Sequence, residues 1–179
     1  MLKGKRFFLL ILLACFLSNT SFGQEKEFDF PPGKKGVEEM LQFILNASNK
    51  ERKALSAWLR PELKDCEAVF DERIATRVYK YQRRLKREVN LVIRPLLQDQ
   101  TEYVFWGANQ EAISNYTSAE ARNFPGGYRE LADYMHPDFD FYRFKFIQPG
   151  RKLGSAYDVL VYVNDKWCII HRPWVVILR

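Results

Sequence analysis

The sequence predicts an α+β protein, in which N-terminal helices, one of them long, pack on a curved antiparallel sheet of about four strands. Two observations support this fold class. Apolar residues recur at helical spacing from Val37 to the proline at position 95. The last third of the chain instead holds three runs rich in aromatic and β-branched residues, separated by turn residues, which indicate a C-terminal three-stranded meander. Helices gathered on a face of an antiparallel sheet are typical of the α+β class.

The first residues have the composition of a secretory signal. Three basic residues within the first six precede an apolar run at 7–17, and a small residue, Gly23, stands at the expected cleavage point. The apolar run is too short to cross a bilayer. We therefore expect a signal peptide over 1–23, a linker or arm over 24–36 and one α+β domain over 37–179. The location is then periplasmic or secreted, with lipid anchoring less favoured and no transmembrane segment.

The basic excess belongs partly to this leader. The whole chain has 28 Lys and Arg against 22 Asp and Glu, and without residues 1–23 the count is 25 against 22, a net charge of +3. So mild an excess argues against a nucleic-acid partner. The glycines and serines match neither a phosphate-binding loop nor a nucleophile elbow. We expect no cofactor and no metal ion, and the partner is an unknown protein or small-molecule ligand.

Helix-start signals divide the first half of the chain. An apolar stripe over 37–47 predicts the first helix, and the capping box at 48–51 opens the second. Pro61 is expected at the first position of a third helix, where proline is favoured. Asp71 caps the longest helix, which should continue until Pro95, because proline cannot continue a helix.

The long helix has the densest charge in the chain. Five cations lie along one flank, with two more behind them: Arg73, Arg77, Lys80, Arg84 and Arg87, then Arg83 and Lys86. One interpretation is a surface for anionic lipid headgroups, phosphates or an acidic partner, which would allow a peripheral contact with the cell envelope. The alternative is a solvated helix face with no partner.

The strands follow. Residues 101–106 predict one strand, and 140–147, 156–163 and 166–172 form the meander, with 140–147 resembling an outer strand. The pair Asn164-Asp165 suits a two-residue hairpin turn, because both residue types tolerate positive φ.

This turn sets the register and the two faces of the hairpin. It places Tyr162 opposite Trp167 and Asp158 opposite His171. One face then carries Asp158, Leu160, Tyr162, Trp167, Ile169 and His171, and the other Tyr157, Val159, Val161, Cys168, Ile170 and Arg172. Both faces are largely apolar, so both must be covered, one by helices and the other by a pocket or a partner.

The pair Asp158 and His171 is the candidate catalytic site. A carboxylate beside an imidazole favours the charged ring and orients it for acid–base chemistry. Tyr162 and Trp167 would line the adjacent ligand pocket. The alternative is a cross-strand ion pair, which contributes at most about 1 kcal/mol.

Two cysteines, Cys66 and Cys168, follow the leader. In an oxidising compartment they could form a disulfide between a helix and the last strand. The alternative is two buried, unpaired thiols, since free cysteine behaves as a small apolar residue.

The C-terminal pattern also carries a resemblance. Tyr157-Asp158, the run 160–164, Trp167 and Arg172-Pro173-Trp174 resemble a group of small exported bacterial proteins of unknown function, and the leader is similar to those of Bacteroidota. Segments 65–70 and 124–128 add to this likeness. The order of elements is similar to the cystatin and nuclear transport factor 2-like superfold. Such folds host enzymes, carriers and immunity proteins, so the likeness implies a fold and no reaction.

Three functional hypotheses result. The first is an exported, single-domain binding or interaction protein without a catalytic role. The second is a nuclear transport factor 2-like small enzyme or ligand carrier with a pocket around Asp158 and His171. The third is an envelope-surface protein that docks through its basic helix. The residues favour a non-enzyme without deciding the question.

Overall fold

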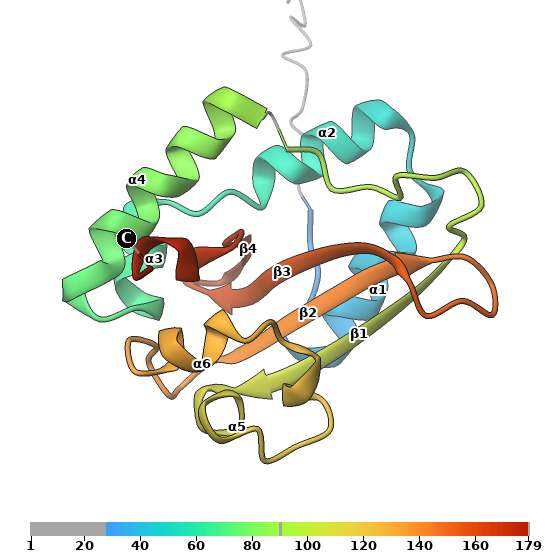
Figure 1. Cartoon of the computed structure of the whole chain (residues 1–179). Helices are drawn as coiled ribbons and strands as arrows, with labels where there is room; N and C mark the ends of the chain where they lie inside the picture. The colour runs from blue at the N-terminus through green and yellow to red at the C-terminus, as the bar shows by residue number, and fades with distance from the viewer. Residues whose placement is uncertain (1–27, 90, 179) are drawn as a thin grey trace, which may run out of the picture.

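The computed structural model describes residues 28–89 and 91–178, and the expected signal peptide at 1–23 lies outside them. The α+β prediction is confirmed (Figure 1). The described elements are α1 (Gly33–Asn46), α2 (Asn49–Trp58), α3 (Leu63–Val69), α4 (Glu72–Val89), β1 (Glu102–Asn109), α5 (Gln110–Asn115), the 3₁₀ helix η1 (Ala121–Asn123), α6 (Gly127–Ala132), β2 (Asp140–Ile147), β3 (Gly154–Val163), β4 (Lys166–Ile169) and the 3₁₀ helix η2 (Pro173–Val176). None of the described helices combines the length and apolar content needed to cross a bilayer.

Local capping signals set the starts of two helices as expected. Ser48 Oγ accepts the Glu51 N–H at 3.3 Å, and a Glu51 carboxylate oxygen accepts the Ser48 N–H at 3.0 Å. Asp71 accepts the Arg73 N–H at 2.8 Å at the start of α4. Helix α1 begins at Gly33, inside the expected arm, so the arm within the described residues is confined to 28–32.

Two helix boundaries differ from the prediction. Helix α3 starts at Leu63 rather than at Pro61, because Asp65 accepts the Glu62 N–H at 2.8 Å and makes Glu62 the cap. Helix α4 ends at Val89, well before Pro95. Beyond it, Ile93 is buried and donates its N–H to Ser56 Oγ at 2.9 Å, so packing against α2 is incompatible with a longer α4.

The four strands form one antiparallel sheet in the order β1-β2-β3-β4. The two-residue turn is confirmed, with φ of 49° at Asn164 and 59° at Asp165. The predicted register holds at Tyr162 opposite Trp167 and continues to Leu160 opposite Ile169. The expectation of an outer position for 140–147 is wrong: β2 lies between β1 and β3, and the outer strands are β1 and β4.

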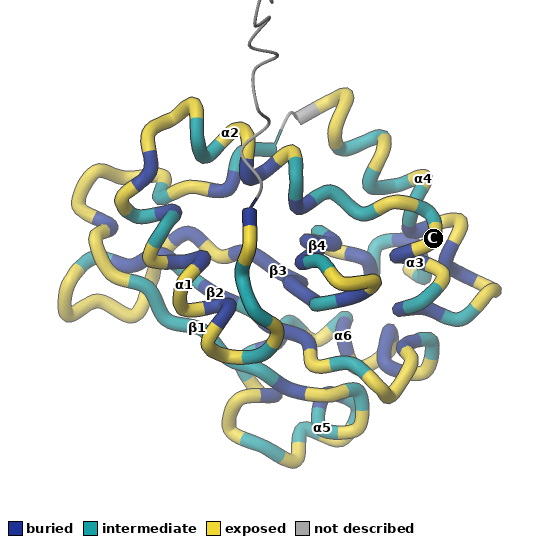
Figure 2. The backbone as a smooth tube through the Cα atoms, turned by 180° about the vertical axis from the view of Figure 1, so that it is seen from behind, coloured by how far each residue is buried: buried dark blue, intermediate teal, exposed yellow. Residues whose placement is uncertain are grey.

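Helices cover both faces of the sheet. On one face α1 and α2 pack on aromatic residues of β2 and on Leu160 and Trp167. On the other, α3, α4, α6 and η2 enclose a second apolar cluster that contains Val161, Cys168 and Ile170. Figure 2 shows the buried positions concentrated on the strands and on the helix sides that face them. The expectation that one face would hold a pocket or a partner is therefore wrong, since helices occupy both.

A β-bulge changes which residues share a face. Arg143 pairs with Asp158 and Tyr142 pairs with Leu160, so Val159 has no partner on β2. An extra residue reverses the alternation of side chains beyond it. Tyr157 consequently lies in the same cluster as Leu160, and Asp158 lies on the opposite face, beside Arg143. The predicted sets of residues on the two faces are thus wrong at these two positions.

Candidate functional site

A two-lobed groove lies between α2, α4 and the end of β4. Its first lobe, of about 580 Å³, is bounded by Ser56, Ala57, Trp58, Arg60, Pro61, Glu62, Tyr79, Gln82, Arg83, Leu85, Lys86, Leu91, Ile93, Lys166, Ile169 and His171. The second, of about 660 Å³, is bounded by Asn49, Lys53, Leu91, Val92, Arg94, Leu96, Ser155, Ala156, Tyr157 and His171. Leu91 and His171 line both lobes. We call this surface the α2–α4 groove.

Long-range hydrogen bonds hold the walls of the groove. The Ile169 N–H donates to the Leu59 carbonyl at 2.8 Å, which fixes the end of α2 against the outer strand β4. Tyr157 Oη donates to the Arg94 carbonyl at 2.7 Å and accepts the Arg94 N–H at 3.2 Å. The bulge at Val159 thus turns Tyr157 toward the segment that forms the floor of the second lobe.

The groove is strongly cationic. Arg60, Arg83, Lys86 and Lys166 line the first lobe with a single carboxylate, and Lys53 and Arg94 line the second with none. Lys166 Nζ lies 3.2 Å from Asp65 and 3.9 Å from Glu62, so its charge is largely neutralised. The other five cations have no ion pair within the described part of the chain. Apolar side chains, among them those of Trp58, Leu85, Leu91, Ile93 and Ile169, line the same space.

The side-chain amide of Gln82 on α4 positions the backbone of His171. Gln82 Oε1 accepts the His171 N–H at 3.0 Å, and Gln82 Nε2 donates to the His171 carbonyl at 2.9 Å. Sequence reasoning missed Gln82, because its role depends on the end of β4 reaching α4, 89 residues away in the chain. Burial lowers the pKa of His171, although the charge of Asp158 acts to raise it.

Asp158 does not line the groove. Its carboxylate is buried, and its Oδ1 lies 2.7 Å from Arg143 Nε. Burial raises the pKa of Asp158, against the opposing charges of Arg143 and His171. Tyr128, fully buried and within the electrostatic influence of Asp158, likewise has a raised pKa because of burial. The structure therefore brings the two predicted catalytic residues close, but pairs the acid with Arg143 and leaves only the imidazole at the groove.

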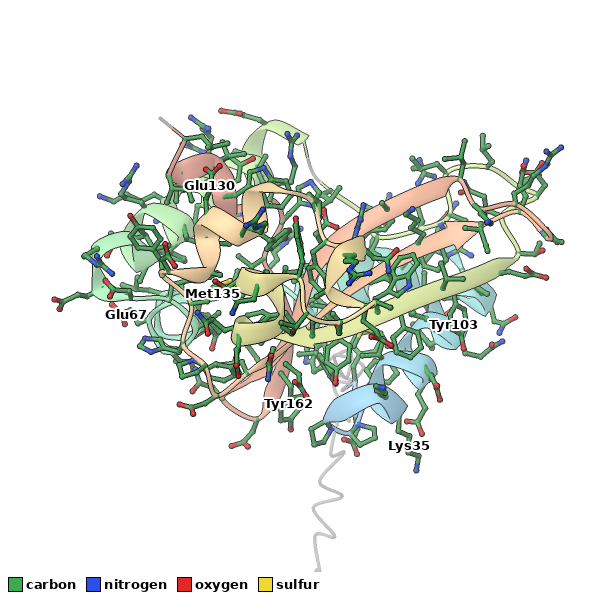
Figure 3. The ribbon with its side chains drawn as sticks, turned by 60° about the horizontal axis from the view of Figure 1, so that its bottom comes forward. Lys35, Glu67, Tyr103, Glu130, Met135 and Tyr162 are labelled. Carbon is green, nitrogen blue, oxygen red and sulfur yellow. The ribbon has the colours of Figure 1, made fainter. Side chains whose placement is uncertain are left out.

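Tyr162 and Trp167 also lie outside the groove. Trp167 is fully buried, and its indole N–H donates to the carbonyls of Phe30 and Pro31, each at 3.1 Å. Tyr162 is half-buried against it, with ring centroids 5.4 Å apart. Figure 3 shows Tyr162 on the side of the sheet where α1 lies, away from α6 with Glu130. The predicted ligand-lining pair thus packs under the N-terminal arm.

Four of the five cations of the predicted basic flank converge on one surface, whereas Arg73 pairs with Asp71 at 2.7 Å. Arg77, Lys80, Arg84 and Arg87 line a groove of about 360 Å³ with Tyr81, Val175 and Val176, between α4 and η2. Arg83 and Lys86, expected behind this flank, line the α2–α4 groove instead. The cations of one helix are thus divided between two surfaces.

Cys66 and Cys168 are buried free thiols, so the structure contains the unpaired-thiol alternative and not the disulfide. Burial raises the pKa of Cys66 to about 12 and also raises that of Cys168. Cys168 Sγ lies 3.5 Å from Asp65, a fully buried carboxylate that sequence reasoning missed. Within residues 28–89 and 91–178, no cluster of three or more His, Cys, Asp or Glu is placed to hold a metal ion.

No known protein family, curated protein or solved structure matches this chain. The class is therefore defined by fold and site alone. It is an α+β protein with a four-stranded antiparallel sheet covered on both faces. A cationic groove lies at the side of the sheet where α2 and α4 meet β4.

The depressed pKa of His171 predicts a pH effect on stability. Because the folded state resists protonation of this ring, its contribution is present above the reference pKa of 6.5 and is lost as the pH falls toward the lower folded value. We expect the melting temperature to fall between about pH 7.5 and about pH 5.5. His171→Gln should reduce this slope, whereas His136→Gln, at an exposed position, should retain it. Equal slopes for His171→Gln and the wild type would contradict the assignment.

Proposed function

We propose that this protein is an exported, single-domain binding protein without a catalytic role, and that its ligand is an anion with an apolar part held in the α2–α4 groove. The observation that carries the proposal is the combination of six cations and one carboxylate around a space lined by apolar side chains. An apolar lining contributes affinity, and a few charged groups fix orientation. Export is inferred from the order of charge and hydropathy in the leader.

The charge arrangement favours an anionic ligand over a neutral one. Lys53, Arg83 and Lys86 have no acidic partner within the described residues, so an anion would gain their attraction without displacing an existing ion pair. Trp58, Leu91 and Ile169 provide apolar surface near these charges. An amphiphilic anion satisfies both features, and its affinity should decrease with increasing salt concentration.

The catalytic alternative has less support. Acid–base chemistry at His171 would require a second group at the same wall, but the carboxylate of Asp158 is directed to Arg143 on the other side. Tyr162 and Trp167 do not line the groove at His171 either. Of the nuclear transport factor 2-like alternative, the ligand carrier is compatible with this groove, whereas the enzyme would need a second catalytic group beside His171.

The probe 1-anilinonaphthalene-8-sulfonate, an anion with apolar rings, tests the groove in a fluorescence titration of the purified protein. Reversing two groove cations, Arg83→Glu with Lys86→Glu, should weaken probe binding at least about tenfold, because two attractions become repulsions. The matched control, Lys80→Glu with Arg87→Glu, changes the net charge equally at the groove between α4 and η2 and should bind like the wild type.

Two outcomes would contradict the proposal. One is a larger loss in the Lys80 and Arg87 control than in the groove variant. The other has two parts. The wild type and the groove variant bind the neutral analogue N-phenyl-1-naphthylamine with equal affinity, and the wild type does not prefer the anionic probe to this analogue. Circular dichroism and melting temperatures of all variants distinguish lost binding from lost folding, since partly folded states bind such probes indiscriminately.

A further inference from the structure

A second cationic surface lies on the flank of α4 that faces the C-terminal turn η2. Arg77, Lys80, Arg84 and Arg87 form it, and we call these four residues the basic row. At 1.5 Å per residue the row extends about 15 Å along the helix. Its length suits several anionic groups side by side better than one small anion.

Much of the charge of the basic row is not neutralised within the protein. Arg77 donates a hydrogen bond to the Val176 carbonyl, which joins the row to η2 but leaves the charge in place. Arg84 lies over the Tyr81 ring and 3.9 Å from Glu88, a loose contact. Lys80 and Arg87 are exposed, and no carboxylate of the described residues is within ion-pairing distance of either.

Apolar side chains border the row. Val175 lies in the groove beside the cations and is half-buried, whereas Ile177 packs against the core. Leu178, two residues beyond η2, is 60% exposed, one of four large apolar side chains so exposed within the described residues. The surface therefore places Val175 next to a row of cations, with the exposed Leu178 three residues further along the chain.

We propose that the α4–η2 surface binds peripherally to an anionic lipid bilayer. The basic row would contact headgroup phosphates, and Val175 and Leu178 would reach the boundary of the acyl chains. Basic residues near an anionic leaflet and apolar side chains at the interface act together in such contacts. The aliphatic residues favour a bilayer over a soluble polyanion, because burial at the acyl boundary stabilises them whereas a polyphosphate backbone offers them no apolar surface.

Sedimentation of the purified protein with vesicles tests this proposal. Vesicles of equimolar phosphatidylglycerol and phosphatidylcholine should bind the wild type, and pure phosphatidylcholine vesicles should not. Binding should weaken as salt is added. Lys80→Glu with Arg87→Glu should reduce binding at least about tenfold, since each basic residue near the surface contributes a factor of about five. Arg83→Glu with Lys86→Glu carries the same charge change on the groove side and should bind nearly like the wild type.

Leu178→Gln tests the apolar part and is expected to weaken vesicle binding several-fold without affecting folding. Wild-type affinity in the Lys80 and Arg87 variant would overturn the proposal, as would an equal loss in the Arg83 and Lys86 variant, which would show an effect of net charge alone. Equal binding of inorganic polyphosphate and vesicles, with no effect of Leu178→Gln, would assign the surface to a soluble polyanion instead. If the reversed variant melts early, Lys80→Gln with Arg87→Gln replaces it, with the same expected direction.

The probe and vesicle experiments use the same two pairs of substitutions with opposite expectations. The proposal for the groove and the proposal for the bilayer surface can therefore be contradicted independently. If the protein binds the anionic probe but no vesicles, the proposed function stands and the bilayer proposal is contradicted. If the protein binds vesicles through the basic row but does not bind the probe, the bilayer proposal stands and the proposed function is contradicted.

Discussion

Replacing Asp65 with alanine is expected to lower the free energy of unfolding by about 3 kcal/mol, because removing one member of a buried charged network leaves its partners unsatisfied. Asp65 is fully buried. Its carboxylate accepts hydrogen bonds from the Glu62 N–H and from the Asn164 side chain, each at 2.8 Å, and lies 3.2 Å from Lys166 Nζ. One carboxylate thus caps α3 and holds the β3–β4 turn.

Urea unfolding at neutral pH measures this effect, and Glu67→Ala, an exposed acid on the same helix, is the matched control. The control should change stability by no more than about 0.5 kcal/mol. A loss for Asp65→Ala no larger than that of the control would contradict the structural role.

The same residue predicts an acid-dependent loss of stability. Burial acts to raise the pKa of Asp65, but hydrogen bonds from Asn164, the Glu62 N–H and Lys166 outweigh it and hold the pKa below 3.8. A depressed folded pKa stabilises the protein above the unfolded value, and this stabilisation is lost as the pH falls through the folded value. The difference in stability between wild type and Asp65→Ala should therefore shrink below about pH 4.

Trp167→Ala is expected to have the largest effect on stability, about 3–5 kcal/mol, which is the usual range for truncating a buried large aromatic side chain. The Trp167 ring lies edge-on to Tyr142 and Tyr162, with centroids 5.7 and 5.4 Å away. Its indole N–H also donates to Phe30 and Pro31, so the substitution should release the N-terminal arm as well as open a cavity.

Two further variants separate these contributions, again by urea unfolding. Trp167→Phe keeps most of the ring volume but removes the N–H, and should cost about 1–2 kcal/mol. Trp106→Ala, on the outer strand β1 and half-buried, should cost less than Trp167→Ala, because less apolar area leaves the interior. A Trp167→Ala protein as stable as Trp106→Ala would exclude the core position of Trp167.

The division of cations on α4 shows how much of the candidate site can be predicted from the sequence. Helical periodicity places Arg77, Lys80, Arg84 and Arg87 on one flank, and the structure brings these four residues together beside η2. Helical periodicity also places Arg83 and Lys86 apart from these four residues, but no local sequence signal indicates which elements pack near Arg83 and Lys86. Those two residues line a groove only because the ends of α2 and β4 approach α4.

The candidate catalytic pair shows the limit of register arguments. The turn at Asn164-Asp165 and the alternation of apolar residues correctly predict the pairing of Tyr162 with Trp167. The pairing continues to Val159 and Ile170, which exchange two backbone hydrogen bonds, but the predicted face of Asp158 is wrong, because Val159 has no partner on β2. A single inserted residue leaves no mark in an apolar run, since Val159 is apolar and buried like Leu160 and Val161.

By itself the sequence determined the α+β class, the helix caps at Ser48 and Asp71 and the hairpin turn of the last two strands. These features depend on hydrogen bonds and backbone preferences within a few residues, so short stretches of sequence encode them. Only the tertiary structure decided the end of α4, the burial of Asp65 and the groove at His171. Each of these depends on groups tens of residues apart, such as Asp65 and Asn164, whose contact exists only once the chain has packed.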